Sequence, residues 1–362
     1  MSRRGASRKG AGGARGSRAP APAPAPALPA LPFEVVLGVL RHTLHQDPGM
    51  AARLLALNQR FRRALQPHVY TRVELATCGA LAKFAQLVRV RPEAARAVRA
   101  LWIGPSHTRS DLLTVLSAPL PGDSAYLDEL RDEVYRNTRF VLRACRRLQD
   151  VALSGSLVSK AVVDSYGTAC QPVRVTSVNP HSFISGFDAP IFQRVEVLTV
   201  CDINLSLTEA DAIRRLPALR SFEYISPKDY GEVARDIRIL EKLLALDERE
   251  LPLEDQLERL LLDVRPTCLQ RLQYRAVASR AAQVVSALEL AAQGTPRAID
   301  IAYADLAPTF VEEWEALRDL VFNAQDEYSR AALGDDVGSW VDPSHALEQL
   351  RSEWRTRTAA LS

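Results

Sequence analysis

Apolar residues recur along most of the chain with one spacing: an apolar position, two residues, a second apolar position, one residue, and a third. The copies are Tyr70/Val73/Leu75, Val98/Leu101/Ile103, Leu148/Val151/Leu153, a weaker Val173/Thr176/Val178, Val195/Leu198/Val200, Leu219/Phe222/Tyr224, Leu269/Leu272/Tyr274 and Ala298/Ile301/Tyr303. Alternate side chains of a strand face the same side. The last two positions of each copy therefore predict a strand with one inward face.

The copies start 28, 50, 25, 22, 24, 50 and 29 residues apart, which indicates a repeat near 25 with two expanded units. Helical segments are predicted between strands, for example over 205–216, with Thr208 as N-cap, and over 277–293. Leucine-rich repeats have this strand spacing and a period of about 20–29 residues. The pattern thus predicts an α/β fold: a curved solenoid resembling leucine-rich repeats over residues 68–307, with a mostly parallel sheet.

The two expanded units are predicted to hold inserted helices, within 104–147 and 226–268. The first would contain a long helix over about 126–147, and the second would contain helices over 233–246 and 254–262. Beyond the solenoid, residues 308–362 predict two C-terminal helices. A solenoid needs its last open face covered, so we expect these helices to cap it, with Trp314, Trp340 and Trp354 in the packing.

The period changes to a helical one over residues 28–67. Phe33, Val36, Leu37, Leu40 and Leu44 recur at helical spacing, and a second stretch carries Leu54 and Phe61. Two or three short helices are predicted, too few to form a stable domain alone. Residues 1–27 are basic and then rich in Ala and Pro, a composition typical of disordered segments.

Charge and cysteine usage narrow the class of protein. The net charge is +3, but six Arg and Lys residues without an acidic partner lie in the first 18 positions. The rest is mildly acidic, so we expect no nucleic-acid binding by the folded part. The five cysteines are scattered and odd in number, which favours small buried hydrophobes over disulfides. No apolar run is long enough to span a bilayer, and we expect a soluble cytoplasmic or nuclear protein.

The sequence lacks several common catalytic motifs. There is no G-x-S-x-G elbow, Walker A loop or H-E-x-x-H motif. His42 and His45 lie three apart, but no Cys, Asp or Glu cluster accompanies them to complete a metal site. The sequence therefore predicts an interaction protein rather than an enzyme, with no cofactor and no metal.

The start of the ordered region resembles an F-box. Leu31-Pro32-Phe33-Glu34-Val35-Val36 is followed by a Leu-rich stretch and by the segment from Asn58 to Leu65, NQRFRRAL. Val69-Tyr70-Thr71-Arg72-Val73-Glu74-Leu75 is similar to the "LYxxVxL" strand of fungal F-box proteins, and residues 91–101 are similar to the "RPxLAxxVRxL" stretch that follows it. The resemblance covers roughly residues 28–104.

This resemblance implies the substrate-recognition subunit of a Skp–cullin–F-box ubiquitin ligase. The F-box-like helices would bind a Skp-family adaptor through Leu31, Pro32, Val35, Val36, Leu40, Leu54 and Phe61. The solenoid would hold a protein substrate on its concave strand face, where we expect the outward positions Arg99, Arg174, Arg220 and Arg271. The asparagine that usually follows each repeat strand is absent, which predicts irregular convex turns.

A second interpretation of residues 31–66 stays open. These helices could cap the N-terminal end of the solenoid in a protein-interaction scaffold unrelated to ubiquitin. The two interpretations differ in which side chains face solvent. Burial of Leu31, Val35 and Leu40 against residues 69–104 would favour the cap.

Overall fold

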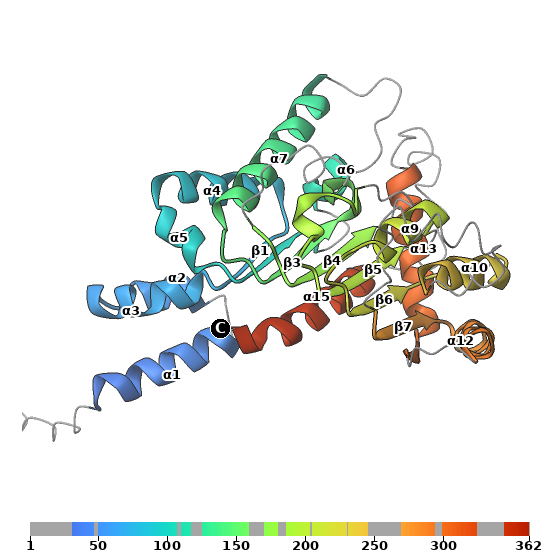
Figure 1. Cartoon of the computed structure of the whole chain (residues 1–362). Helices are drawn as coiled ribbons and strands as arrows, with labels where there is room; N and C mark the ends of the chain where they lie inside the picture. Colours follow the sequence, from blue (N-terminus) through green and yellow to red (C-terminus); the bar gives the residue numbers. More distant parts are fainter. Residues whose placement is uncertain are drawn as a thin grey trace, which may run out of the picture.

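A computed structural model describes residues 31–46, 50–106, 110–116, 125–158, 170–179, 186–202, 205–229, 231–244, 269–293, 299–323 and 344–361. The predicted tail (1–27), Cys268, Trp340 and the helix predicted over 254–262 lie outside these ranges. Within them, one sheet of eight parallel strands is ordered as in the chain (Figure 1). The strands are β1 (Arg72–Leu75), β2 (Ala100–Ile103), β3 (Asp150–Ser154), β4 (Arg174–Asn179), β5 (Val197–Asp202), β6 (Ser221–Ile225), β7 (Arg271–Ala276) and β8 (Asp300–Asp305).

Each copy of the repeated apolar spacing coincides with one strand, so the predicted α/β class and parallel sheet are confirmed. The phase of the weak fourth copy is wrong by one residue. Val175, not Thr176, pairs in register with Val151 of β3 and Leu198 of β5. Thr176 and Val178 therefore point to the opposite face of the sheet from the one that the spacing predicted.

One face of the sheet is covered by helices that connect successive strands. These are α4 (Cys78–Val90), α5 (Pro92–Ala97), α6 (Asp111–Leu116), α7 (Ala125–Ala144), α8 (Gly155–Leu157), η3 (Pro190–Phe192), α9 (Leu207–Arg214), α10 (Val233–Leu243) and α12 (Ala278–Ala292). Leu101, Leu198 and Leu272 of the strands are fully buried against this layer. Helix α9 starts at a capping box formed by Ser206 and Glu209, so its N-cap is Ser206, two residues before the N-cap expected at Thr208.

The opposite face is covered by the C-terminal helices α13 (Pro308–Asn323) and α15 (Ser344–Thr358), followed by η5 (Ala359–Leu361) (Figure 1). Buried Trp314 and Trp354 pack there against residues of the central strands such as Trp102 and Val178. We expected these helices at the last open face of the solenoid. They lie across the sheet instead, because strand residues such as Trp102, Val178 and Ile225 present apolar side chains to this face, and these side chains need cover.

The N-terminal helices α1 (Phe33–Gln46), α2 (Ala51–Leu55) and α3 (Gln59–Val69) have a small core of their own. Leu44, Leu54 and Leu65 are buried in it. Asn58 begins α3 as its N-cap, since its side chain accepts a 2.9 Å hydrogen bond from the backbone N–H of Phe61. Helix α1 extends away from the sheet, so most of its surface is left to solvent (Figure 1).

Candidate interaction surfaces

Helix α1 and the residue pair before it expose a stripe of large apolar side chains. Leu31, Val35 and Val39 are 66%, 49% and 58% exposed. Their spacing of four residues places them along one side of the helix. The other side is committed to the small core, where Leu40 and Leu44 pack with α2 and α3. We call Leu31, Val35 and Val39 the α1 stripe; contiguous exposed apolar side chains of this kind mark partner sites.

The seven residues expected at the adaptor interface divide into three groups. Leu31, Pro32 and Val35 are exposed, Val36, Leu40 and Phe61 are half-buried, and Leu54 is buried. Leu54 therefore supports the surface from below and is not available for contact. Val39 was missed by the sequence analysis, although its spacing of four from Val35 is the signal that places it in the stripe.

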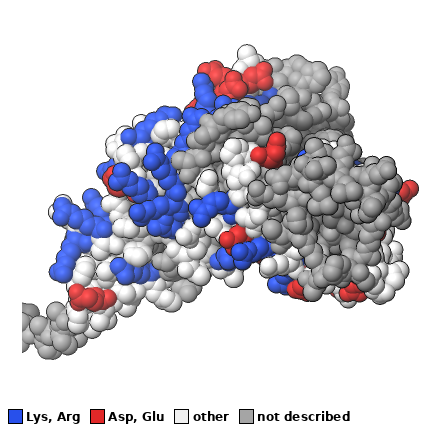
Figure 2. Space-filling view, in the orientation of Figure 1, with Lys and Arg blue, Asp and Glu red and all other residues white. Residues whose placement is uncertain are grey.

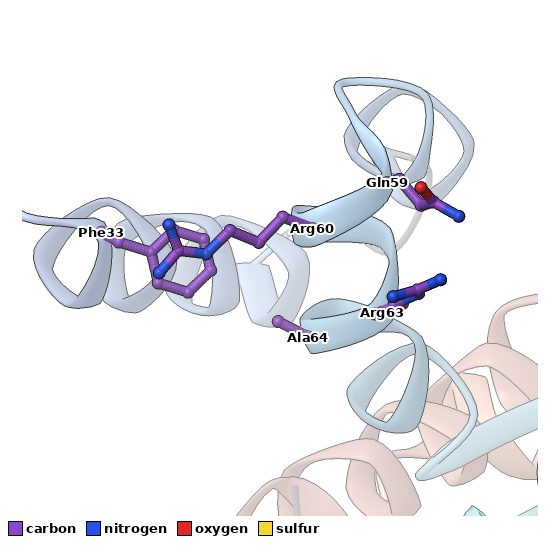
Figure 3. A pocket seen from close by; sticks show the side chains of 5 residues that line it. All are labelled: Phe33, Gln59, Arg60, Arg63 and Ala64. Atoms are coloured by element: carbon purple, nitrogen blue, oxygen red, sulfur yellow. The ribbon is translucent and has the colours of Figure 1, made fainter.

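The N-terminal end of α1 is fixed to α3 by aromatic and cationic contacts. The rings of Phe33 and Phe61 stack with centroids 4.9 Å apart. The guanidinium of Arg60 lies 3.8 Å from the centre of the Phe33 ring, a favourable arrangement. Figure 3 shows Arg60 reaching across to Phe33, while Gln59 and Arg63 extend away from it. These contacts hold the start of α1, and with it the α1 stripe, in one orientation on α3.

The three helices differ in how they meet the sheet. Helix α3 packs against α5 and β1, and the hydroxyl of Thr71 donates a 2.9 Å hydrogen bond to the carbonyl of Pro67 at its end. Helix α1 packs mainly on α2 and α3. Leu31 and Val35 are exposed and Leu40 belongs to the small core, so the burial against residues 69–104 that would favour the cap interpretation is not found for α1.

The strand face expected to hold a substrate is occupied by α15. Arg355 donates a 2.7 Å hydrogen bond to Glu74 of β1, and Arg357 donates a 2.9 Å hydrogen bond to Asp150 of β3. Two residues before Arg355 in the same helix, Glu353 lies 2.9 Å from the guanidinium of Arg275 in β7. Burial would raise the pKa of Glu353, but hydrogen bonds and charge from Arg275 outweigh it and lower the pKa. Ion pairs thus fix α15 along the sheet from β1 to β7.

Two of the four arginines expected to line this face lie in strands, and the other two lie just before strands. Arg174 and Arg271 pair in the register row of Asp150 and Asp300, on the side of α15. Arg99 and Arg220 each lie one residue before that row, outside β2 and β6. Arg99 donates a 3.2 Å hydrogen bond to the carbonyl of Arg147. Arg271 is about half exposed and lies 3.5 Å from Asp300.

A buried charged cluster lies at the carboxyl ends of β6 and β7. Asp236 of α10 accepts hydrogen bonds of 3.0 Å from Lys228, 2.7 Å from the hydroxyl of Tyr274 and 3.0 Å from Arg280. All four residues are buried. Burial lowers the pKa of Lys228, and the charge of Asp236 opposes this shift. Because the cluster is closed to solvent and links α10, α12 and β7, its role is to hold these elements together.

The part of the chain described here offers few groups for chemistry. No cluster of three His, Cys, Asp or Glu side chains suited to a metal ion occurs among these residues. Cys78, Cys145, Cys170 and Cys201 are buried free thiols, as expected, and burial raises the pKa of Cys145 to about 12. None of the described helices has the length and apolar character needed to cross a membrane.

Comparison of the chain with protein-family models, with curated protein sequences and with solved structures finds no match.

Proposed function

We propose that the chain is the substrate-recognition subunit of a Skp–cullin–F-box ubiquitin ligase, in which the α1 stripe binds the Skp-family adaptor. The observation that carries this proposal is the exposure of Leu31, Val35 and Val39 along and just before a helix whose other face packs on α2 and α3. A helix that presents anchors at intervals of four residues suits the apolar groove of a partner. The resemblance of this segment to an F-box supplies the class of partner.

The remainder of the chain suits a recognition role. Short parallel strands in chain order, with connecting helices on one side, are the arrangement expected of a leucine-rich-repeat-like solenoid. Such bodies present extended surfaces to protein partners. A subunit of this kind works in the cytoplasm or nucleus, where cullin ligases act, and carries out no chemistry itself.

In this proposal the substrate binds away from the centre of the sheet. Helices α13 and α15 cover the strand face at β2 to β6, so a protein cannot dock there while they are in position. Among the arginines first considered, Arg220 and Arg271 are exposed and Arg99 and Arg174 are half-buried. Replacing Arg220 and Arg271 with Glu tests whether these two residues contact the substrate. Loss of partner capture without a lower Tm would show that they do.

A second candidate is a protein-interaction scaffold unrelated to ubiquitin, with N-terminal helices that only cap the solenoid. The contacts of α3 with β1 and α5 favour this alternative. They account for α3 but give no reason for three exposed apolar residues along α1. The two functions differ in whether a change confined to the α1 stripe has any effect on partner binding.

Co-purification with a recombinant Skp-family adaptor separates the two. Val35→Asp/Val39→Asp places two charges in the stripe without touching the small core. Val90→Asp is a matched control, because Val90 is 72% exposed at the end of α4 and outside the stripe. We expect the wild type and the control to recover the adaptor and the double variant to lose it. Equal recovery by all three proteins, or by none, would favour the scaffold.

A further inference from the structure

A groove lined by arginines lies between α4, α5 and α7, away from the α1 stripe. It has a volume of about 480 Å³, within the usual range for ligand sites. Its lining contains four guanidinium groups, from Arg89 at the end of α4, Arg96 on α5, Arg143 in the last turn of α7 and Arg146 just after that helix. All four side chains are exposed. The fold thus brings together basic residues that lie about 50 positions apart in the chain.

The positive charge of this groove is not neutralised by the residues that the structure describes. Within the described ranges, none of the four guanidinium groups has a carboxylate within 4.0 Å, although the exposed Glu93 lies on the same short helix as Arg96. Figure 2 shows Lys and Arg side chains gathered over the end of the molecule that holds α3, α4 and α5. Uncompensated like charges repel one another, so this groove is suited to an anionic ligand.

The floor of the groove is apolar and narrows the choice of ligand. Val88, Pro92, Ala95 and Ala144 line it together with Phe140. The guanidinium of Arg89 lies 4.7 Å from the centre of the Phe140 ring. That contact occupies one face of the one aromatic ring among the lining residues, whereas single-stranded nucleic acids need open aromatic faces for base stacking. Arginine forks, in contrast, bind carboxylates and phosphates in a bidentate manner.

We propose that this groove binds an acidic segment of a partner protein, with its carboxylate or phosphate groups on the four arginines and an apolar side chain on the floor. We name Arg89, Arg96, Arg143 and Arg146 the arginine groove. The proposal does not rest on adaptor binding by α1, since the two surfaces share no residue. If the ligase assignment also holds, the arginine groove would recognise acidic substrates.

A structural role for the same residues predicts a different outcome. Arg89 and Arg143 lie in the last turns of α4 and α7, where positive charge stabilises a helix through its dipole. A purely structural role would lower Tm on substitution. It would give no binding of acidic peptides by the wild-type protein.

Fluorescence anisotropy with the full-length protein tests the proposal. The probes are a short labelled peptide containing Glu and one Leu, the same peptide with phosphoserine in place of Glu, its Gln counterpart, and a single-stranded RNA of similar charge. We expect the two anionic peptides to bind, the difference between them telling which anion is preferred, and the Gln peptide and the RNA to bind at least about tenfold more weakly.

Arg96→Glu/Arg143→Glu should weaken binding of the anionic peptides by at least about tenfold. Arg235→Glu/Arg238→Glu makes the same change in charge at exposed positions of α10 and should leave binding within about twofold. Should the first variant fold poorly, Arg96→Gln/Arg143→Gln removes the charges without reversing them. Binding of RNA as tight as the peptides, equal loss in both Glu variants, or no binding of anionic peptides by the wild type would overturn the proposal.

Discussion

The indole N–H of Trp354 donates a 2.8 Å hydrogen bond to Oδ1 of Asp150, joining the last long helix to the third strand across 204 positions of the chain. The Asp150 side chain is 1% exposed and also receives a bond from Arg357. The ring of Trp354 lies 5.7 Å from that of Trp102 in β2. A buried carboxylate, an indole and a guanidinium thus combine to fix α15 on the sheet.

The bonds made by Asp150 predict that its loss destabilises the protein more than the loss of the Trp354 indole N–H. Asp150→Ala leaves the Arg357 guanidinium and the indole N–H without their acceptor, and should cost about 3 kcal/mol of unfolding free energy. Trp354→Phe removes one hydrogen bond but keeps most of the ring packing, and should cost about 1–2 kcal/mol. Guanidinium denaturation measures both. If Asp150→Ala proved no more costly than Trp354→Phe, the carboxylate would not be holding the helix.

Asp236 gives a second prediction, because one buried acid is shared by Lys228 and Arg280. Asp236→Ala removes the buried carboxylate that Lys228 and Arg280 share and should cost about 3–5 kcal/mol. Lys228→Met removes one cation while Asp236 keeps Arg280 and Tyr274, and should change the stability by about 1 kcal/mol or less. Urea denaturation of the two variants provides the comparison. Equal losses of unfolding free energy in the two variants would show that the stabilising effect of Asp236 comes from its pair with Lys228 alone.

The buried cysteine thiols are expected to react slowly with alkylating reagents in the folded protein. Burial and the nearby Asp111 raise the pKa of Cys78 to about 12, and burial alone raises the pKa of Cys170 to about 12. Little reactive thiolate forms in the folded protein, so Cys78, Cys145, Cys170 and Cys201 should resist iodoacetamide at pH 8 and react when the protein is unfolded. Peptide mass spectrometry gives the modified positions. Rapid native labelling of any of the four would contradict their burial.

The raised pKa values of the thiols also make the free energy of unfolding depend on pH. A thiol whose pKa is higher in the folded state contributes stability that is fully present below the unfolded value of 9.0 and is lost as the pH rises toward about 12. The free energy of unfolding should therefore fall with pH above about 9, and Cys145→Ala/Cys170→Ala should reduce the slope of that fall.

The strands were predictable because their inward positions are apolar in every copy of the repeat except the fourth, where Ser177 takes one of them. The phase of β4 was not, because Val175 and Val178 are both buried, on opposite faces. When a parallel sheet is covered on both sides, alternation no longer tells which residues face which layer. Trp102 between two repeated positions, and Cys201 and Ile225 directly after the last position of their copies, were the available sign that a second layer covers the sheet.

The candidate surfaces were predictable in unequal measure. A helical spacing of four connects Leu31, Val35 and Val39, so the α1 stripe is readable from the sequence. The arginine groove is not, because Arg96 and Arg143 come from separate elements and the folded part carries no positive net charge. Only the packing of α5 against α4 and α7 shows that basic residues are concentrated on one side of the molecule.

The central claim is that the α1 stripe binds a Skp-family adaptor, and calorimetric titration of purified adaptor into the purified chain tests it most directly. We predict saturable binding by the wild type and by Val90→Asp, and a Kd raised by about a hundredfold or more in Val35→Asp/Val39→Asp, with the Tm unchanged. Absence of binding by the wild type, or the same Kd for all three proteins, would contradict it.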